Sequence, residues 1–182
     1  MKILAMYFSG TGNTKHVVEK MKESCEKLGA EVEPISIEQF TDEDMEKIGP
    51  ADFLLFAYPV YGSMSPMIMW RFIKRIAKII EDKKCIVIAT QASFSGDGGA
   101  YLARILRKCY ASIVSIEHFK MPSNISDSNL LGNESNRSMD KKIRVTEKKI
   151  ELYCEDFVKE IRRKKGDGIG STHGRKGASG RV

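Results

Sequence analysis

The chain has 182 residues and a mass of 20.5 kDa, which suits one compact domain better than two. Hydrophobic residues make up 42% and charged residues 30%, as in globular proteins with a buried core, and no apolar run reaches the roughly 18 residues of a membrane span. The net charge is +6, but residues 162–182 hold seven of the 30 basic residues and only one acidic residue, so residues 1–161 carry no net charge. A nucleic-acid interface, which needs a basic stripe on the folded body, is therefore disfavoured.

The first part of the chain alternates between strand-like and helix-like patterns. Residues 2–8 are a short apolar run, typical of a first strand rather than of a cleavable signal peptide, and we expect a cytoplasmic protein. From Asn13 onward the apolar residues recur at helical spacing, and Gly29 closes this helix. Residues 30–37 alternate like a strand at a sheet edge, where Pro34 is tolerated.

The same alternation continues to the end of the folded body. The expected elements are a buried strand at 53–58, a helix at 66–80, a buried strand at 85–90, a helix at 99–110, a strand at 111–119 and a long helix at 137–165. This order predicts an α/β fold, a doubly wound three-layer sandwich around a five-stranded parallel sheet. Its ligand would bind beyond the carboxyl ends of the strands. Residues 162–182 hold six of the 15 glycines, and we predict a disordered tail there.

The Cys and His residues do not have the spacing of a metal site. The four Cys residues include no C-x-x-C pair, and each lies in an apolar segment, so we predict buried, reduced thiols rather than zinc or iron–sulfur ligands. The three His residues share no ligand-like spacing either, and we expect no bound metal.

The most specific signal is Ser9-Gly10-Thr11-Gly12-Asn13-Thr14, between the first strand and the first helix. Three hydroxyls, two glycines and the N–H groups of a helix start predict a phosphate site without a cation in the loop. The alternative is a Gly-rich turn in which one hydroxyl caps the helix. A P-loop is excluded because Lys15 stands where its second glycine would be. A small-protein phosphatase is excluded because no Cys has an Arg six residues later, and a phosphorelay receiver because the first strand lacks acidic residues at its end.

The segment YFSGTGNT at 7–14 resembles the FMN-phosphate loop of flavodoxins, most closely those of the short clostridial type. YPVYGSMSP at 58–66 and TQASFSGDGG at 90–99 follow the third and fourth strands, where the family has its other two flavin loops. With KMPSN at 120–124, they also resemble the flavodoxin part of flavodoxin–ferredoxin fusion proteins, although the ferredoxin cysteines are absent. The resemblance covers residues 1–161 and implies a flavodoxin-like FMN-binding domain with strand order 2-1-3-4-5.

The resemblance implies a cofactor site made of these three loops. Its residues are Ser9, Gly10, Thr11, Gly12, Asn13 and Thr14 at the phosphate, Pro59, Val60, Tyr61 and Gly62 over one face of the flavin ring, and Gln91, Ala92, Ser93, Phe94 and Asp97 at the loop that faces its N1–C2=O edge. Gly62 would let the peptide after Tyr61 flip and accept a hydrogen bond from the reduced flavin. Clostridial flavodoxins have Trp just before Gly-Asp-Gly, whereas this chain has Ser95 there and Phe94 as the nearest aromatic residue.

The function that the resemblance implies is electron transfer, with FMN cycling between its oxidised, semiquinone and hydroquinone forms. The expected partners are redox proteins such as a separate ferredoxin or reductase, and a carrier is favoured over an enzyme. One alternative is an FMN-dependent NAD(P)H oxidoreductase of the same fold, similar to quinone reductases. Another is a flavin-free module that binds a phosphate ligand or a protein. The protein would be a monomer or a dimer.

Two further features allow competing interpretations. Met64, Met67, Met69 and Trp70 cluster after the second loop, where core packing is favoured over an adaptable partner surface. Asp97 precedes the helix expected from about residue 98, and we expect its carboxylate to cap that helix and to act electrostatically on the flavin rather than as a catalytic base.

Overall fold

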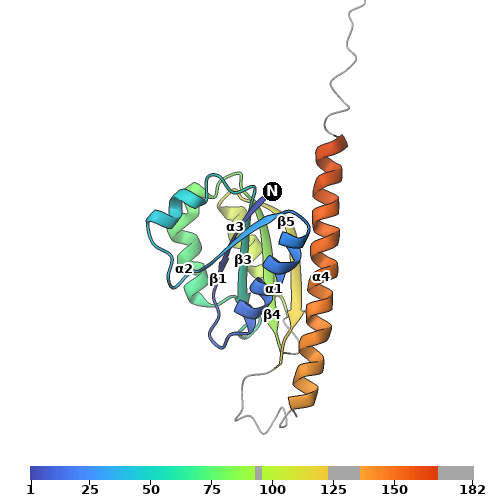
Figure 1. Ribbon diagram of the computed structural model, residues 1–182. Coiled ribbons are helices and arrows are strands. Elements are labelled where there is room, and N and C mark those ends of the chain that lie inside the picture. The colour runs from blue at the N-terminus through green and yellow to red at the C-terminus, as the bar shows by residue number, and fades with distance from the viewer. Residues whose placement is uncertain (93–95, 123–135, 168–182) are drawn as a thin grey trace, which may run out of the picture.

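The computed structural model describes residues 1–92, 96–122 and 136–167, which form a three-layer α/β sandwich (Figure 1). The strands are β1 (Lys2–Tyr7), β2 (Glu31–Ser36), β3 (Phe53–Pro59), β4 (Lys84–Gln91) and β5 (Ser112–Lys120). The helices are α1 (Asn13–Lys27), α2 (Met67–Ile76), α3 (Gly98–Lys108) and α4 (Asn136–Asp167), with short 3-10 helices η1 (Glu43–Lys47) and η2 (Ala77–Ile79).

The elements expected from the sequence are all present, with small changes at their ends. Gly29 has φ 74 and follows the last turn of α1, as predicted. The helix expected at 66–80 is α-helical only to Ile76 and continues as η2. Helix α4 runs to Asp167, so residues 162–167 of the segment predicted to be a disordered tail are helical. The rest of that segment, residues 168–182, lies outside the described residues.

All five strands are parallel and lie in the order β2-β1-β3-β4-β5, which confirms the predicted fold class. Strand β1 lies between β2 and β3, so the order reverses at β1. In an open α/β sheet the crevice beside such a reversal, beyond the carboxyl ends of the strands, is the usual ligand site. The loops that follow β1, β3 and β4 all begin at this end of the sheet.

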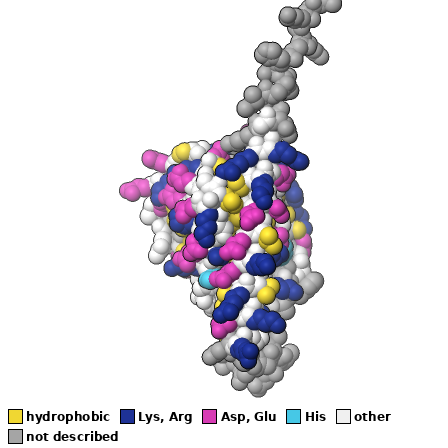
Figure 2. Space-filling view, turned by 45° about the vertical axis from the view of Figure 1, so that its right-hand side comes forward, with side chains coloured by type: hydrophobic (Ala, Val, Ile, Leu, Met, Phe, Trp, Pro, Cys, Tyr) yellow, Lys and Arg dark blue, Asp and Glu magenta, His cyan; other side chains and the backbone are white. Residues whose placement is uncertain are grey.

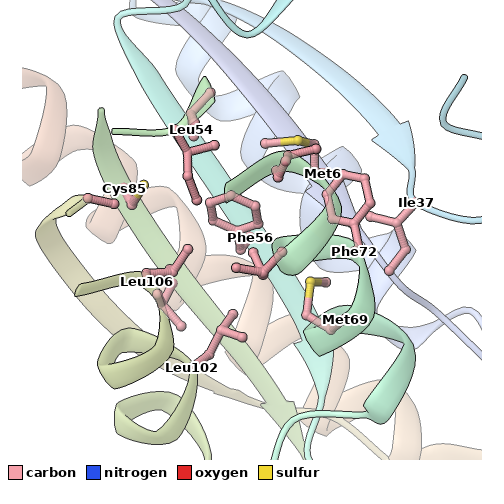
Figure 3. Packing of buried hydrophobic residues seen from close by; sticks show 14 of the residues in the cluster. Met6, Ile37, Leu54, Phe56, Met69, Phe72, Cys85, Leu102 and Leu106 are labelled. Carbon is pink, nitrogen blue, oxygen red and sulfur yellow. The ribbon is translucent and has the colours of Figure 1, made fainter. Parts of the chain in front are cut away.

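Each face of the sheet is covered by one pair of helices. On one face, Leu54, Phe56 and Cys85 of the sheet pack against Phe72 and other apolar residues of α2 and α3 (Figure 3). On the other face, α1 and α4 pack against each other and cover residues such as Ile3, Leu55 and Phe119. Strands β1, β3 and β4 are apolar in sequence because both of their faces are buried.

The two edge strands are protected in different ways. Pro34 lies in β2, where it has no N–H to offer a further strand. Along β5, side chains bind the backbone groups of His118: the Glu117 carboxylate accepts from its N–H at 2.7 Å, and the Lys149 ammonium donates to its carbonyl at 2.8 Å. The Thr146 hydroxyl donates to the carbonyl of Lys120, so α4 covers this end of the strand.

Candidate functional site

The loop between β1 and α1 presents backbone N–H groups at the start of a 15-residue helix. Gly12 has φ 93, a conformation that residues with a side chain rarely adopt, and it immediately precedes α1. The Ser9 hydroxyl accepts the N–H of Lys15 at 3.1 Å. Within the described chain, no atom accepts the N–H groups of Gly12, Asn13 or Thr14. The loop therefore combines a helix N-terminus with three N–H donors that a bound anion could use.

The hydroxyls of this loop are used partly inside the protein. Thr14 is buried, and its Oγ1 lies 2.8 Å from Oγ1 of Thr90, the penultimate residue of β4. Ser9 accepts a bond from the helix start, as the capping interpretation of the loop supposed. At least two of the three hydroxyls, those of Ser9 and Thr14, thus have partners inside the protein. Ser9, Thr11 and Thr14 nevertheless all line the same pocket.

The segment after β5 lies beside the first loop. The Asn13 side-chain amide donates to the carbonyl of Pro122 at 2.9 Å, which joins the first loop to this segment. Met121 and Pro122 line the pocket with the first loop. They belong to the KMPSN segment at 120–124, which resembles part of the flavodoxin–ferredoxin fusion proteins, but they were missing from the predicted site. The topology could have indicated them, because β5 must end at the same edge of the sheet as its parallel neighbours.

The loop after β3 contains a tight hairpin. The backbone N–H and carbonyl groups of Tyr61 and Met64 bond to each other at 3.1 Å in both directions, and the two residues between them, Gly62 and Ser63, have φ 54 and 66. Positive φ at both central residues is typical of a type I′ turn. The Tyr61 side chain reaches back to the first loop, because a Cβ added to Gly10 would lie 3.2 Å from the Tyr61 hydroxyl oxygen.

The loop after β4 is anchored by close contacts of its glycines. A Cβ on Gly98 would lie 2.6 Å from Cγ2 of Val60, and one on Gly99 would lie 2.6 Å from Nε2 of His118. The His118 ring in turn lies 3.3 Å, Nδ1 to Oε1, from the Gln91 side chain. These glycines allow α3 to start directly against the second loop and β5. The predicted site residues Ser93 and Phe94, like Ser95, lie outside the described residues.

Asp97 stands at the position that precedes α3, but its carboxylate does not cap the helix. It forms an ion pair with Arg104, two turns along the same helix, and this contact raises the pKa of the guanidinium. The capping predicted for Asp97 is therefore wrong.

The Tyr58 side chain contacts the start of the same helix: its hydroxyl donates to the carbonyl of Gly98, the first residue of α3, at 2.7 Å. Burial and the negative charge of Asp97 hold the pKa of Tyr58 well above its usual range, so this phenol stays a neutral donor.

The loops enclose one pocket of about 280 Å³. Its lining residues are Ser9, Gly10, Thr11, Asn13, Thr14, Pro59, Val60, Tyr61, Thr90, Gln91, Ala92, Met121 and Pro122. The structure thus brings together ten of the predicted site residues, while Gly12, Gly62 and Asp97 do not line the pocket. A larger hollow of about 460 Å³ lies between α4 and β5, away from these loops, and has no glycine-rich cradle.

The methionines after the second loop divide between core and surface. Met69, in α2, is fully buried, as predicted. Core packing was also favoured for Met64 and Met67, but they are 51% and 64% exposed, so that expectation is wrong for these two residues. The parts of the chain that the structure describes contain no group of three or more His, Cys, Asp or Glu side chains placed to hold a metal ion. None of the helices in the described ranges combines the length and apolar character needed to cross a membrane.

Solved structures share the fold of this chain. The flavodoxin of Megasphaera elsdenii, in its two-electron reduced form, is 21% identical with a TM-score of 0.58, over 69% of this chain and 91% of that one. The flavodoxin of Fusobacterium nucleatum bound to flavin mononucleotide is 16% identical with a TM-score of 0.58, over 90% of this chain and 98% of that one. Rubredoxin oxygen:oxidoreductase of Desulfovibrio gigas is 14% identical with a TM-score of 0.57, and the match covers 85% of this chain but only 36% of that larger one.

Sequence comparison is more specific than these structural likenesses, which show the fold alone. No curated protein sequence matched the chain. The family model of the flavodoxin domain matches residues 4–120, which include most of β1, all of β2 to β5 and the loops after β1, β3 and β4. With its sheet order and the match over this core, the chain belongs to the flavodoxin family.

Proposed function

We propose that this chain binds FMN in the pocket of about 280 Å³ and carries electrons between redox proteins. The observation that carries the proposal is the cation-free cradle at the start of α1, where the N–H groups of Gly12, Asn13 and Thr14 have no acceptor in the described chain. A phosphate monoester dianion is the natural ligand for such a set of donors. The family relationship agrees, since one structural relative contains bound flavin mononucleotide.

The residues present fit the phosphate and the ring of FMN. Thr11 and the N–H groups that follow it would hold the phosphate, together with Ser9 and Asn13. The Tyr61–Met64 hairpin would cover one face of the flavin ring, and the backbone at Gln91 and Ala92 would face its pyrimidine edge. When bound, FMN supplies the one-electron and two-electron redox chemistry, while this chain's residues position it and restrict water at the ring.

A ligand comparison tests the phosphate part of the proposal. FMN and riboflavin have the same ring, but riboflavin lacks the phosphate, so its affinity measures the rest of the site. Two or three charge-assisted hydrogen bonds of about 1.5 kcal/mol each should make FMN bind at least about 100-fold more tightly. Quenching of flavin fluorescence gives both dissociation constants. Equal affinity for the two ligands would show that the cradle does not hold the phosphate, and failure to bind either would end the FMN proposal.

Stepwise anaerobic reduction of the FMN-loaded protein tests the carrier part. A one-electron carrier must separate the two reduction steps, so a blue one-electron-reduced flavin should accumulate in the visible spectrum. Direct passage from oxidised to fully reduced flavin, with NADPH-driven reduction of a quinone, would instead assign the chain to the NAD(P)H oxidoreductases of this fold.

A further inference from the structure

The longer helices on the two faces of the sheet differ in charge. Helices α2, η2 and α3 contain seven basic residues and no Asp or Glu: Arg71, Lys74, Arg75, Lys78, Arg104, Arg107 and Lys108. On the opposite layer, α1 and α4 mix both signs, and Figure 2 shows Lys and Arg interspersed with Asp and Glu on the face around α4. The zero net charge of residues 1–161 therefore conceals a local excess of basic side chains on these helices, although the acidic η1 packs on the same face of the sheet.

The exposed side of α2 forms a continuous row of long side chains. Met67, Arg71 and Lys74 recur every three or four residues, which places them on one side of α2, and Lys78 continues the row in η2; all four are exposed. The other side, with Phe72 among its residues, is buried against the sheet. Arg71 and Lys78 form no ion pair with any residue that the structure describes. Their charge is therefore available to a partner.

This row begins at the rim of the pocket. Tyr61 lines the pocket and is 53% exposed, and Met64 is bonded to it across the hairpin. Met67, the first residue of α2, is the most exposed of these three apolar side chains. Exposed Tyr and Met side chains beside Arg are typical of the centre of a protein interface. We call Tyr61, Met64, Met67, Arg71, Lys74 and Lys78 the α2 surface.

Two contacts fix the sides of this surface. Arg75 turns away from it, because its guanidinium pairs with Asp42 and donates to the carbonyl of Phe40 at 3.2 Å. The acidic residues around η1 therefore lie beyond Arg75. On the other side, the Lys74 ammonium lies 3.8 Å from the ring centroid of Trp70, the only Trp in the chain. Trp70 is thus a built-in reporter of contact at the α2 surface.

We propose that the α2 surface docks an acidic redox protein. Carboxylates of that partner contact Arg71, Lys74 and Lys78, while apolar side chains at the centre of its interface contact Tyr61, Met64 and Met67. The proposal rests on the proposed function, because this apolar end of the surface borders the pocket assigned to FMN. Electrostatic complementarity selects the sign of the partner: a row of unpaired cations attracts and orients a negatively charged surface. A basic partner would be repelled from the α2 surface.

A Trp70 fluorescence titration with a tryptophan-free acidic ferredoxin tests this assignment. Binding at the α2 surface should change Trp70 emission, with an affinity that falls at least about tenfold as salt rises from about 20 mM to about 200 mM. The variant Arg71→Glu/Lys78→Glu should bind the ferredoxin at least about tenfold more weakly at low salt. The matched control is Lys141→Glu/Lys148→Glu, which reverses two exposed charges seven residues apart on α4 and should keep wild-type affinity.

Three results would overturn the assignment. The first is equal weakening of ferredoxin binding by both double variants, which would reflect net charge alone. The second is a ferredoxin affinity that does not change with salt. The third is quenching of Trp70 fluorescence by NADPH but not by ferredoxin, which would assign the surface to a nucleotide. The titration is run on protein with and without FMN, and FMN retention is measured separately by absorbance. Loss of FMN binding would therefore disprove the proposed function, while the ferredoxin affinity still decides the docking surface.

Discussion

The hydroxyls of Thr14 and Thr90 lie 2.8 Å apart in the interior, and they join the first turn of α1 to the end of β4. Thr90 Oγ1 also lies 3.5 Å from the carbonyl of Tyr58 on β3. Two loops of the pocket are thus held at a fixed separation by one buried polar contact. Because both side chains are buried, each hydroxyl has few other partners to replace this contact.

Replacing either threonine by valine keeps the shape and removes one hydroxyl. Thr14→Val and Thr90→Val should each lower the free energy of unfolding by about 1–3 kcal/mol, because the remaining hydroxyl is left buried without this partner. The double variant should cost clearly less than the two single losses combined. Urea unfolding of all four proteins measures this coupling, and additive losses would show that the two hydroxyls do not depend on each other.

Gly98 is predicted to be essential for close packing between α3 and the second loop. In Gly98→Ala the new methyl group would meet Cγ2 of Val60 at 2.6 Å, and such overpacking costs about 1–3 kcal/mol. Adding Val60→Ala should recover part of the loss, since it removes the clashing methyl groups. Thermal unfolding checks this, with Gly49→Ala as control, because the nearest atom to that added carbon is 4.0 Å away.

The hairpin should respond in opposite directions to two neighbouring substitutions. Gly62 has φ 54 with open space around its Cα, so Gly62→Ala introduces only backbone strain and should cost about 1 kcal/mol. Ser63 has φ 66 and already carries that strain, so Ser63→Gly should stabilise the protein by up to about 1 kcal/mol. Melting temperatures of the flavin-free protein provide the measurement. The same sign for both changes would argue against this turn conformation.

The four thiols should differ in reactivity. Cys154 is buried, its thiol donates to the carbonyl of Met21 at 3.9 Å, and its interaction with the buried Cys25 raises its pKa. Burial raises the pKa of Cys85 to about 12. Cys109 is only half-buried, so a thiol reagent should modify it first, at a rate that grows with pH as thiolate forms. Cys109→Ser should abolish the fast phase. A fast phase that survives in this variant would mean that one of the buried thiols is accessible.

Alkaline pH should weaken the fold. The Cys85 thiol loses its proton near its ordinary pKa when unfolded but only at about 12 when folded. Between these values the unfolded chain binds fewer protons, so the free energy of unfolding falls as pH rises, by up to about 1.4 kcal/mol per pH unit for this thiol. Unfolding measured from pH 8 to 11 should therefore show a smaller slope for Cys85→Ala than for the wild type. Equal slopes would show that this thiol does not contribute.

Hydrophobic patterning was sufficient to predict the sheet, because strands buried on both faces are apolar throughout. The first loop was predictable too, since few sequences place three hydroxyls and two glycines at a helix start. Details that depend on contacts between residues that are not neighbours in the sequence were not predictable. The sequence could not show that Arg104, rather than the helix start, binds the Asp97 carboxylate, nor that the Thr14 hydroxyl pairs with Thr90 across the fold. Summing charge over residues 1–161 likewise missed the row of basic side chains along α2 and η2, because packing decides which side of a helix stays exposed.

The side chains that bind the backbone of β5 also bear on how the protein behaves at high concentration. A bare edge strand offers unpaired N–H and carbonyl groups to any other extended chain, and this is a common start of aggregation. Here Lys149 and Thr146 already occupy the carbonyls of His118 and Lys120, and Pro34 interrupts the opposite edge. The sheet therefore resists growth into a larger one through either edge, and contacts with other proteins are directed to its helical faces and loops.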